Sequence, residues 1–165
     1  MKAWFALALA ACGVPAPSFG PDGGDETCQA YQTPMTTDLM SPSVSFKTDV
    51  MPVLTGNCAS ASCHGVSDGA AGNLFLGAEL KHGSDSGMVF TNLMVMSQQA
   101  AAMPYVTPGD PEQSYLMHKL DADQCSIASQ CVGGNCQHTM PYDGQLPVET
   151  RDIVRRWIAQ GAMNN

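Results

Sequence analysis

The segment Cys58-Ala-Ser-Ala-Ser-Cys63-His64-Gly65 decides how the rest of this chain is interpreted. It places two thiols on one short stretch and an imidazole directly after the second thiol. A disulfide between the two cysteines, beside a surface histidine, is one explanation of this spacing. A zinc or copper site is another, but a second pair of ligands at short, regular spacing does not follow.

A third interpretation uses all three side chains. Two cysteines with a histidine after the second form the arrangement that attaches haem c, because each thiol adds across one haem vinyl group and the histidine ligates the iron from the same side. The usual spacing is C-x-x-C-H, whereas four residues separate Cys58 from Cys63 here. We expect Cys58 and Cys63 to hold one haem c, with His64 as an axial ligand of the iron.

Helical signals surround this segment on both sides. Asp110-Pro111-Glu112-Gln113 combines an N-cap residue, a proline at the first helical position and a glutamine three residues after the cap. Residues 88–103 are apolar and compatible with a helix, and Pro147 opens a helix that continues to about Gln160. Before the segment, one helical face is apolar: Phe46, Val50, Val53 and Leu54. Pro52 predicts an early end or a kink there. With no convincing strand, these patterns predict an all-α fold with long loops.

Four further stretches occur in an order that resembles the class I cytochrome c domain, in particular the small modules of planctomycete-type cytochrome c proteins. They are Asp49-Val-Met-Pro-Val-Leu, Pro108-Gly-Asp-Pro-Glu-Gln-Ser-Tyr-Leu, Met140-Pro-Tyr-Asp-Gly-Gln-Leu and Ile153-Val-Arg-Arg-Trp-Ile-Ala-Gln-Gly-Ala. The resemblance covers about residues 46–163. It implies a small cytochrome c fold over residues 44–165, with three to five helices packed round one covalently bound haem. The cysteine-rich insert 121–138 departs from the family.

The same resemblance implies that a methionine before the last helix is the second axial ligand. Met140 has this position, and Pro141 stiffens the loop that would present its thioether. Met103-Pro104-Tyr105 repeats the triplet that begins at Met140, so Met103 remains a competitor, as do the other histidines. Of these we expect His118 to be a partly exposed helix residue and His82 to be solvated. His138 lacks the adjacency to a cysteine that a second haem requires.

The N-terminal residues predict an anchor. Lys2 precedes the apolar run Ala3 to Ala11, which is too short to span a bilayer but fits a signal-peptide core. Leu9-Ala10-Ala11-Cys12 resembles the lipobox of bacterial lipoproteins, in which the cysteine receives a diacylglycerol; an ordinary secretory signal is the alternative. We expect residues 1–11 to be a lipoprotein signal peptide and 12–43 a flexible tether rich in proline and glycine. The protein would then be lipid-anchored in the cell envelope, facing the periplasm or in the outer membrane.

Seven cysteines are present, of which one is assigned to lipid and two to haem. An even remainder in an oxidising compartment predicts two disulfides among Cys28, Cys125, Cys131 and Cys136. Three pairings exist, and we expect Cys125–Cys131 within the insert and Cys28–Cys136 at the tether. A zinc site from these four would lack paired C-x2-C spacing.

Charge and coordination together indicate the class of function. Seven basic residues against 15 acidic ones, a net charge of −8, form no basic patch for nucleic acid. Removal of Lys2 with the signal peptide leaves −9, which favours a redox partner protein with a basic docking patch. His64 and a methionine would fill both axial positions, which predicts an electron carrier rather than an enzyme. The alternatives are a haem subunit or sensor with an open axial site, and a haem-free, disulfide-stapled interaction module of the envelope.

Overall fold

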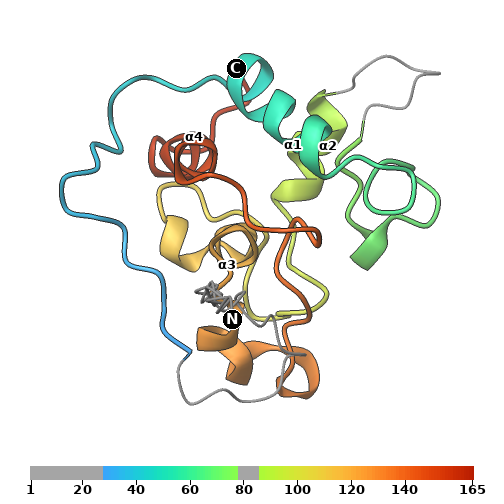
Figure 1. The fold of residues 1–165 in the computed structure, drawn as a ribbon. Helices are drawn as coiled ribbons and strands as arrows, with labels where there is room; N and C mark the ends of the chain where they lie inside the picture. Colours follow the sequence, from blue (N-terminus) through green and yellow to red (C-terminus); the bar gives the residue numbers. More distant parts are fainter. Residues whose placement is uncertain (1–27, 78–85) are drawn as a thin grey trace, which may run out of the picture.

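A computed structural model describes residues 28–77 and 86–165, and these form a helical domain with long loops (Figure 1). The elements are η1 Phe46–Val50, α1 Met51–Asn57, η2 Ala71–Asn73, α2 Ser86–Leu93, η3 Pro111–Gln113, α3 Tyr115–Asp121, η4 Gln124–Gln130, η5 Val132–Gly134 and α4 Val148–Ala159. Within the described residues there is no strand, only an isolated bridge between Met96 and Pro104, so the expected all-α class is confirmed there. None of the described helices is long and apolar enough to cross a membrane. The predicted signal peptide, Cys12 and His82 lie outside the described residues.

The first helical segment changes its pitch at Pro52. Ser45 caps η1 through its hydroxyl, which accepts from the backbone N–H of Thr48, while the carboxylate of Asp49 accepts from the N–H of Ser45 at 2.7 Å. Pro52 stands in the first turn of α1, which follows η1 without a break. The residues before it form the wider π-type turn of η1. The early end expected at Pro52 does not occur, because the helix continues through Asn57 toward Cys58; the change from the π-type turn to the α-helix falls directly before Pro52.

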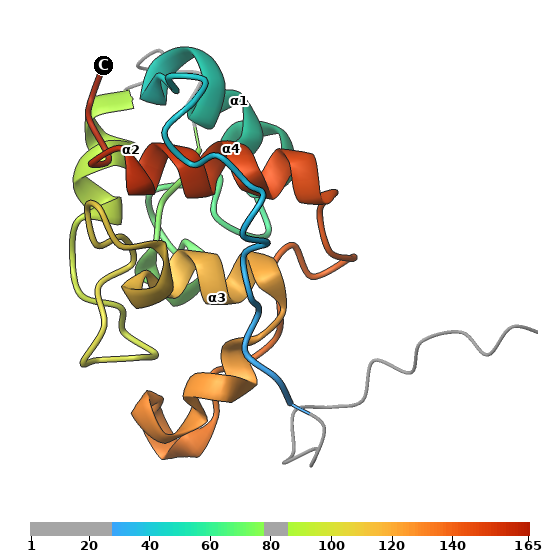
Figure 2. The same ribbon diagram turned by 90° about the vertical axis from the view of Figure 1, so that its left-hand side faces the viewer.

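Helix α4 forms the centre of the domain, between α1 and α3 (Figure 2). Its Trp157 is buried and packs against Phe46, with ring centroids 5.0 Å apart. Phe90 of α2 meets Phe46 edge-on at 5.5 Å and completes this aromatic cluster. The main core thus joins the first helical segment, α2 and the last helix, as the apolar faces predicted from the sequence require.

Residues 28–43, which we call the strap, run across α4 and α3 instead of forming a free tether (Figure 2). Arg156 donates to the carbonyl of Asp38 at 3.0 Å. The side-chain amide of Gln160 donates to the carbonyls of Leu39 and Pro42 at 3.0 and 2.9 Å. The expectation of a flexible tether as far as residue 43 is therefore wrong for residues 28–43.

The disulfide pairing also differs from the expected one. The structure pairs Cys28 with Cys125 and Cys131 with Cys136. The helical turns of η4 separate Cys125 from Cys131 and leave the first exposed and the second buried, so these two side chains face different surroundings. The chain reverses between Cys131 and Cys136 through two glycines with φ of 66° and 73°, a conformation that residues with a Cβ rarely adopt.

Candidate functional site

The turn after α1 gathers Cys58, Cys63 and His64. Cys58 ends the helix, with its N–H donating to the carbonyl of Leu54 at 2.8 Å. Within the turn the N–H of Cys63 donates to the carbonyl of Ser60 at 3.0 Å, and the N–H of His64 donates to the carbonyl of Cys58 at 3.2 Å. These bonds hold both thiol-bearing residues and the histidine on one compact loop.

Gly65 allows this loop to close. A Cβ added at Gly65 would lie 2.1 Å from the carbonyl oxygen of Ala59, far inside van der Waals contact. Gly77 has the same role at the other side of the loop, because its Cβ would lie 2.5 Å from the carbonyl oxygen of Gly65. Two backbone segments therefore approach each other directly at the histidine.

The imidazole of His64 is oriented by the backbone of the segment that follows. Its Nδ1 lies 2.7 Å from the carbonyl oxygen of Leu74, and its own carbonyl accepts from the N–H of Leu76 at 2.8 Å. A carbonyl oxygen only accepts hydrogen bonds, so Nδ1 carries the proton and Nε2 of the neutral ring keeps its lone pair. His64 is half-buried, and the buried side chains of Leu74 and Leu76 anchor the segment that holds it.

The segment around Leu74 is in turn bound to the body of the domain. The side-chain amide of Asn92, on α2, donates to the carbonyl of Phe75 at 3.0 Å. The hydroxyl of the buried Tyr105 donates to the carbonyl of Gly72 at 3.2 Å. The orientation of His64 therefore depends on Asn92 of α2 and on Tyr105, and not on the turn alone.

The two thiols of the turn differ in exposure and in acidity. Cys58 is buried and Cys63 is exposed, and both are outside the disulfides. Burial, with a smaller contribution from Cys63, raises the pKa of Cys58 to about 11, so at neutral pH Cys58 is a protonated thiol. No cluster of three His, Cys, Asp or Glu side chains able to hold a metal ion occurs in residues 28–77 and 86–165.

The two methionines considered as iron ligands lie in different surroundings. Met140 is half-buried on the loop before α4, and its N–H donates to the carbonyl of Lys119, at the end of α3, at 2.9 Å. Thr139 donates through its hydroxyl to the same carbonyl at 3.0 Å. Met103 is almost fully buried, and its carbonyl accepts from the N–H of Ser97 in a tight turn. Met140 therefore belongs to an anchored surface loop and Met103 to the core.

No family model, curated protein or solved structure matches this chain. The donor set is therefore judged by its own chemistry. Two thiols and an imidazole whose Nδ1 is already hydrogen-bonded fit a haem held by two thioethers and one nitrogen ligand.

His118 was expected to be a partly exposed helix residue, and the structure corrects this. It is buried, with Nδ1 2.9 Å from the carboxylate of Asp123 and Nε2 3.1 Å from the carbonyl oxygen of Glu112. Burial lowers the pKa of His118, but the hydrogen bond and charge of Asp123, followed by Glu112, outweigh burial and raise it. Both nitrogens donate, so His118 has no lone pair for iron. Asp123, five residues further along the chain and just past the end of α3, was the signal in the sequence.

A buried group of ion pairs was missed by sequence reasoning altogether. Asp121, at the end of α3, accepts from Arg151 and, at 2.6 Å, from Arg155. Arg155 is also paired with Asp152, and Tyr31 of the strap covers it with its ring centroid 4.6 Å from the guanidinium carbon. The cluster ties α3, α4 and the strap together. From the sequence alone, arginines four residues apart on one helix, such as Arg151 and Arg155, indicate a solvent-exposed face. Only the tertiary contacts show that these two side chains are buried.

Proposed function

We propose that this protein is a monohaem c-type cytochrome, anchored in the cell envelope through a lipid on Cys12, that transfers single electrons. In this proposal the helices pack round one haem c bound to Cys58 and Cys63, with His64 and Met140 as axial ligands. The observation that carries the proposal is the 2.7 Å hydrogen bond between Nδ1 of His64 and the carbonyl of Leu74.

That hydrogen bond matters because it selects the nitrogen available to a metal. Donation from Nδ1 fixes the tautomer and the plane of the ring and makes Nε2 a better donor. A histidine that only filled space on the surface would not need a backbone segment folded over it. When bound, the haem supplies a one-electron iron couple, and ligation by histidine and methionine raises its potential relative to two histidines.

The anchored loop before α4 supports Met140 as the second ligand. Its backbone bond to Lys119 and the donation from the side-chain amide of Gln145 to the carbonyl of Asp121, at 2.7 Å, attach both halves of the loop to α3. A ligand loop has to hold its thioether still, because axial ligation depends on a constant position. Met103 would have to leave the core to serve the same purpose.

The distribution of charge supports a basic redox partner. The exposed acidic residues in the described part of the chain are Asp38, Asp49, Asp68, Glu112, Asp143 and Glu149. Of the basic residues there, Lys119, Arg151 and Arg155 are buried, and Lys47 is exposed. An acidic surface of this kind draws a partner with a basic docking patch at rates that fall as salt rises.

The first test is the intact mass of the mature protein made in a host with haem-attachment machinery. A gain of about 616 Da for the haem, together with acyl chains on Cys12, is the expected result. Loss of the gain in Cys58→Ser and Cys63→Ser would locate the thioethers. A haem-free protein with Cys58 and Cys63 joined in a disulfide would refute the proposal in favour of the interaction module.

The second test separates an electron carrier from a haem with an open site. The ferric protein should show weak absorption near about 695 nm, which the resemblance associates with methionine ligation, and should resist carbon monoxide when reduced. Met140→Ala should abolish the band and admit carbon monoxide, while the matched control Met103→Leu keeps the band. A band that survives Met140→Ala would contradict the ligand assignment, and rapid binding of carbon monoxide by the unaltered protein would favour the sensor.

A further inference from the structure

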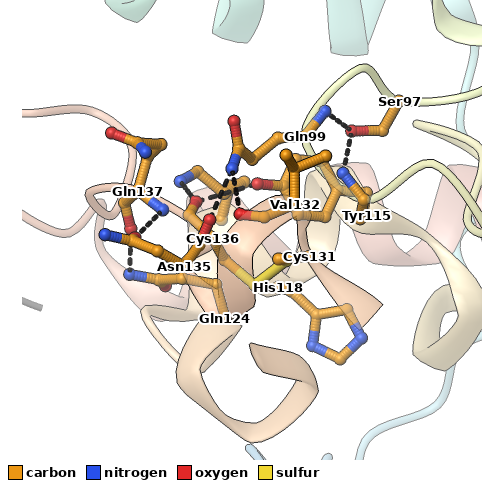
Figure 3. Close-up of a disulfide and its surroundings, with 12 residues drawn as sticks. Ser97, Gln99, Tyr115, His118, Gln124, Cys131, Val132, Asn135, Cys136 and Gln137 are labelled. Atoms are coloured by element: carbon orange, nitrogen blue, oxygen red, sulfur yellow. Dashed lines mark hydrogen bonds between the residues drawn. A yellow bond between two sulfur atoms is a disulfide. The ribbon is translucent and has the colours of Figure 1, made fainter. Parts of the chain in front are cut away.

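Residues 86–109 and residues 124–137 contain no Asp, Glu, Lys, Arg or His. They are joined in the structure, since the N–H of Val132 donates to the carbonyl of Gln99 at 2.8 Å and the side chain of Gln99 donates to the carbonyl of Asn135 (Figure 3). Figure 2 shows α2, the loops that follow it and the insert one below the other along one side of the molecule. We call the exposed residues of these two stretches the uncharged flank.

The uncharged flank exposes apolar side chains. Val95, Met96 and Val132 are 50%, 51% and 60% exposed. Small or amide residues surround them on the same two stretches: Gln98, Ala101, Ala102, Gly133, Gly134, Asn135 and Gln137 are all exposed. The acidic residues exposed in the described chain belong to other segments, so this flank differs from the rest of an acidic protein in both charge and polarity.

The strap brings the N-terminal chain to this flank. Cys28 is bonded to Cys125, which lies in the second uncharged stretch. Fifteen residues lie between Cys12 and Cys28, and the sixteen steps from one to the other span at most about 58 Å. A lipid on Cys12 would therefore keep the bilayer within that distance of the insert, rather than of residue 44, where the helical domain begins.

We propose that the uncharged flank is the face that the domain lays on the lipid bilayer, with Val95, Met96 and Val132 entering the headgroup region. This inference rests on the lipidation of Cys12 in the proposed function. The exposed acidic residues belong to other segments and stay available to a basic partner protein.

A lipid surface suits this flank better than a protein does. Anionic headgroups repel exposed carboxylates, and the two stretches of the uncharged flank contain none. Burial of apolar side chains at the interface is favourable, and the covalent anchor removes most of the entropic cost of reaching it. A basic partner protein, by contrast, is attracted to the acidic faces and gains no electrostatic energy here.

Hydrogen exchange of the lipidated holoprotein tests the inference. We expect backbone amides in peptides from residues 94–103 and 126–135 to exchange several-fold more slowly on vesicles of phosphatidylcholine and phosphatidylglycerol than in the vesicle-free Cys12→Ser protein. Peptides from α4 should be unchanged. Met96→Asp with Val132→Asp should remove the protection, whereas Met35→Asp and Met163→Asp, at exposed positions outside the flank, should retain it.

Each other outcome overturns the inference. Unchanged exchange in both stretches, with the acyl mass confirmed, would leave the flank facing water or a protein. Slow exchange without vesicles that increases with protein concentration would assign the flank to a second copy of this chain. If the mass shows no acyl group, the anchor fails separately, and coupling Cys12 to a maleimide lipid repeats the measurement. Absence of protection in that arm refutes the flank itself.

Discussion

Removing the Cys28–Cys125 disulfide is expected to destabilise the domain more than removing Cys131–Cys136. The two bridges have sequence separations of 97 and 5. A cross-link restricts the unfolded chain, and the lost entropy grows with the logarithm of the loop it closes. The loop entropies correspond to about 4.7 kcal/mol for the long loop and about 2 kcal/mol for the short one. Their difference, about 2.6 kcal/mol, depends only on the ratio of the loop lengths.

The native contacts change this difference in a known direction. Without Cys28–Cys125 the end of the strap is released, and Tyr31 can leave its place on Arg155 and its 2.6 Å hydrogen bond to Asp123. In the short loop the carbonyl of Cys136 still accepts from Tyr115 and Lys119 of α3, which keep the insert in place. The gap between the two variants should therefore equal or exceed the entropic figure.

The assay is equilibrium unfolding in urea of Cys28→Ser/Cys125→Ser and Cys131→Ser/Cys136→Ser, followed by circular dichroism. Because both cysteines of a bridge are replaced, neither variant has a thiol left over from the broken bridge, and Cys58 and Cys63 are the same in both. The first should also show the larger denaturant slope, because its unfolded chain is free to expand. Equal losses of unfolding free energy, or a greater loss for the short bridge, would refute the reasoning from loop length.

Three further predictions concern single groups. The pKa of His118 is raised in the fold, so its contribution to the free energy of unfolding is complete below the unfolded-state pKa of about 6.5 and is lost as pH rises through the native pKa. His118→Gln should flatten that part of the stability profile measured in urea, and an unchanged profile would contradict the assignment. Asp121→Asn leaves Arg151 and Arg155 without the carboxylate that both of them pair with, and it should lower the free energy of unfolding by about 3 kcal/mol in thermal or urea unfolding. A decrease below about 1 kcal/mol would mean that the pairs are solvated. Gly65→Ala forces the turn open and should lower the fraction of protein with covalent haem in the mass spectrum, while Gly56→Ala, with open space around its Cβ, keeps the haem and gains up to about 1 kcal/mol.

The elements predicted correctly from the sequence are those with local signals. The carboxylate of Asp110 accepts from the N–H of Gln113, as the capping pattern requires, and Pro147 stands at the start of α4. The helical run expected for residues 88–103 fails after Leu93 for an equally physical reason. The hydroxyl of Ser97 accepts from two N–H groups of the next residues and closes a turn, a competition with the helix that an apolar pattern does not record.

The candidate site divides in the same way. The turn from Cys58 to His64 is a local motif, and its thiols and histidine were recognisable from spacing alone. The carbonyl of Leu74 that orients the histidine was not, because backbone acceptors have no sequence signature and the tautomer follows from a contact ten residues away. The same limit applies to the disulfides, whose pairing depends on which way η4 turns its two ends.

The strap shows why amino-acid composition is a poor guide to the flexibility of a segment. Proline and glycine disfavour helices and strands, and they do so both in a free linker and in an extended segment that is bound to a protein surface. Composition therefore does not distinguish the two. What distinguishes the two is the set of partners, and those of the strap lie far away in the chain: Asp123 is 92 residues from Tyr31, and Gln160 is 121 from Leu39. Proline also limits the conformations of the unfolded chain, so a proline-containing segment loses less entropy when it is bound. A stretch without helical or strand patterning can therefore bind as a strap if the folded domain offers it partners. Here those partners include the side-chain amide of Gln160 and the thiol of Cys125.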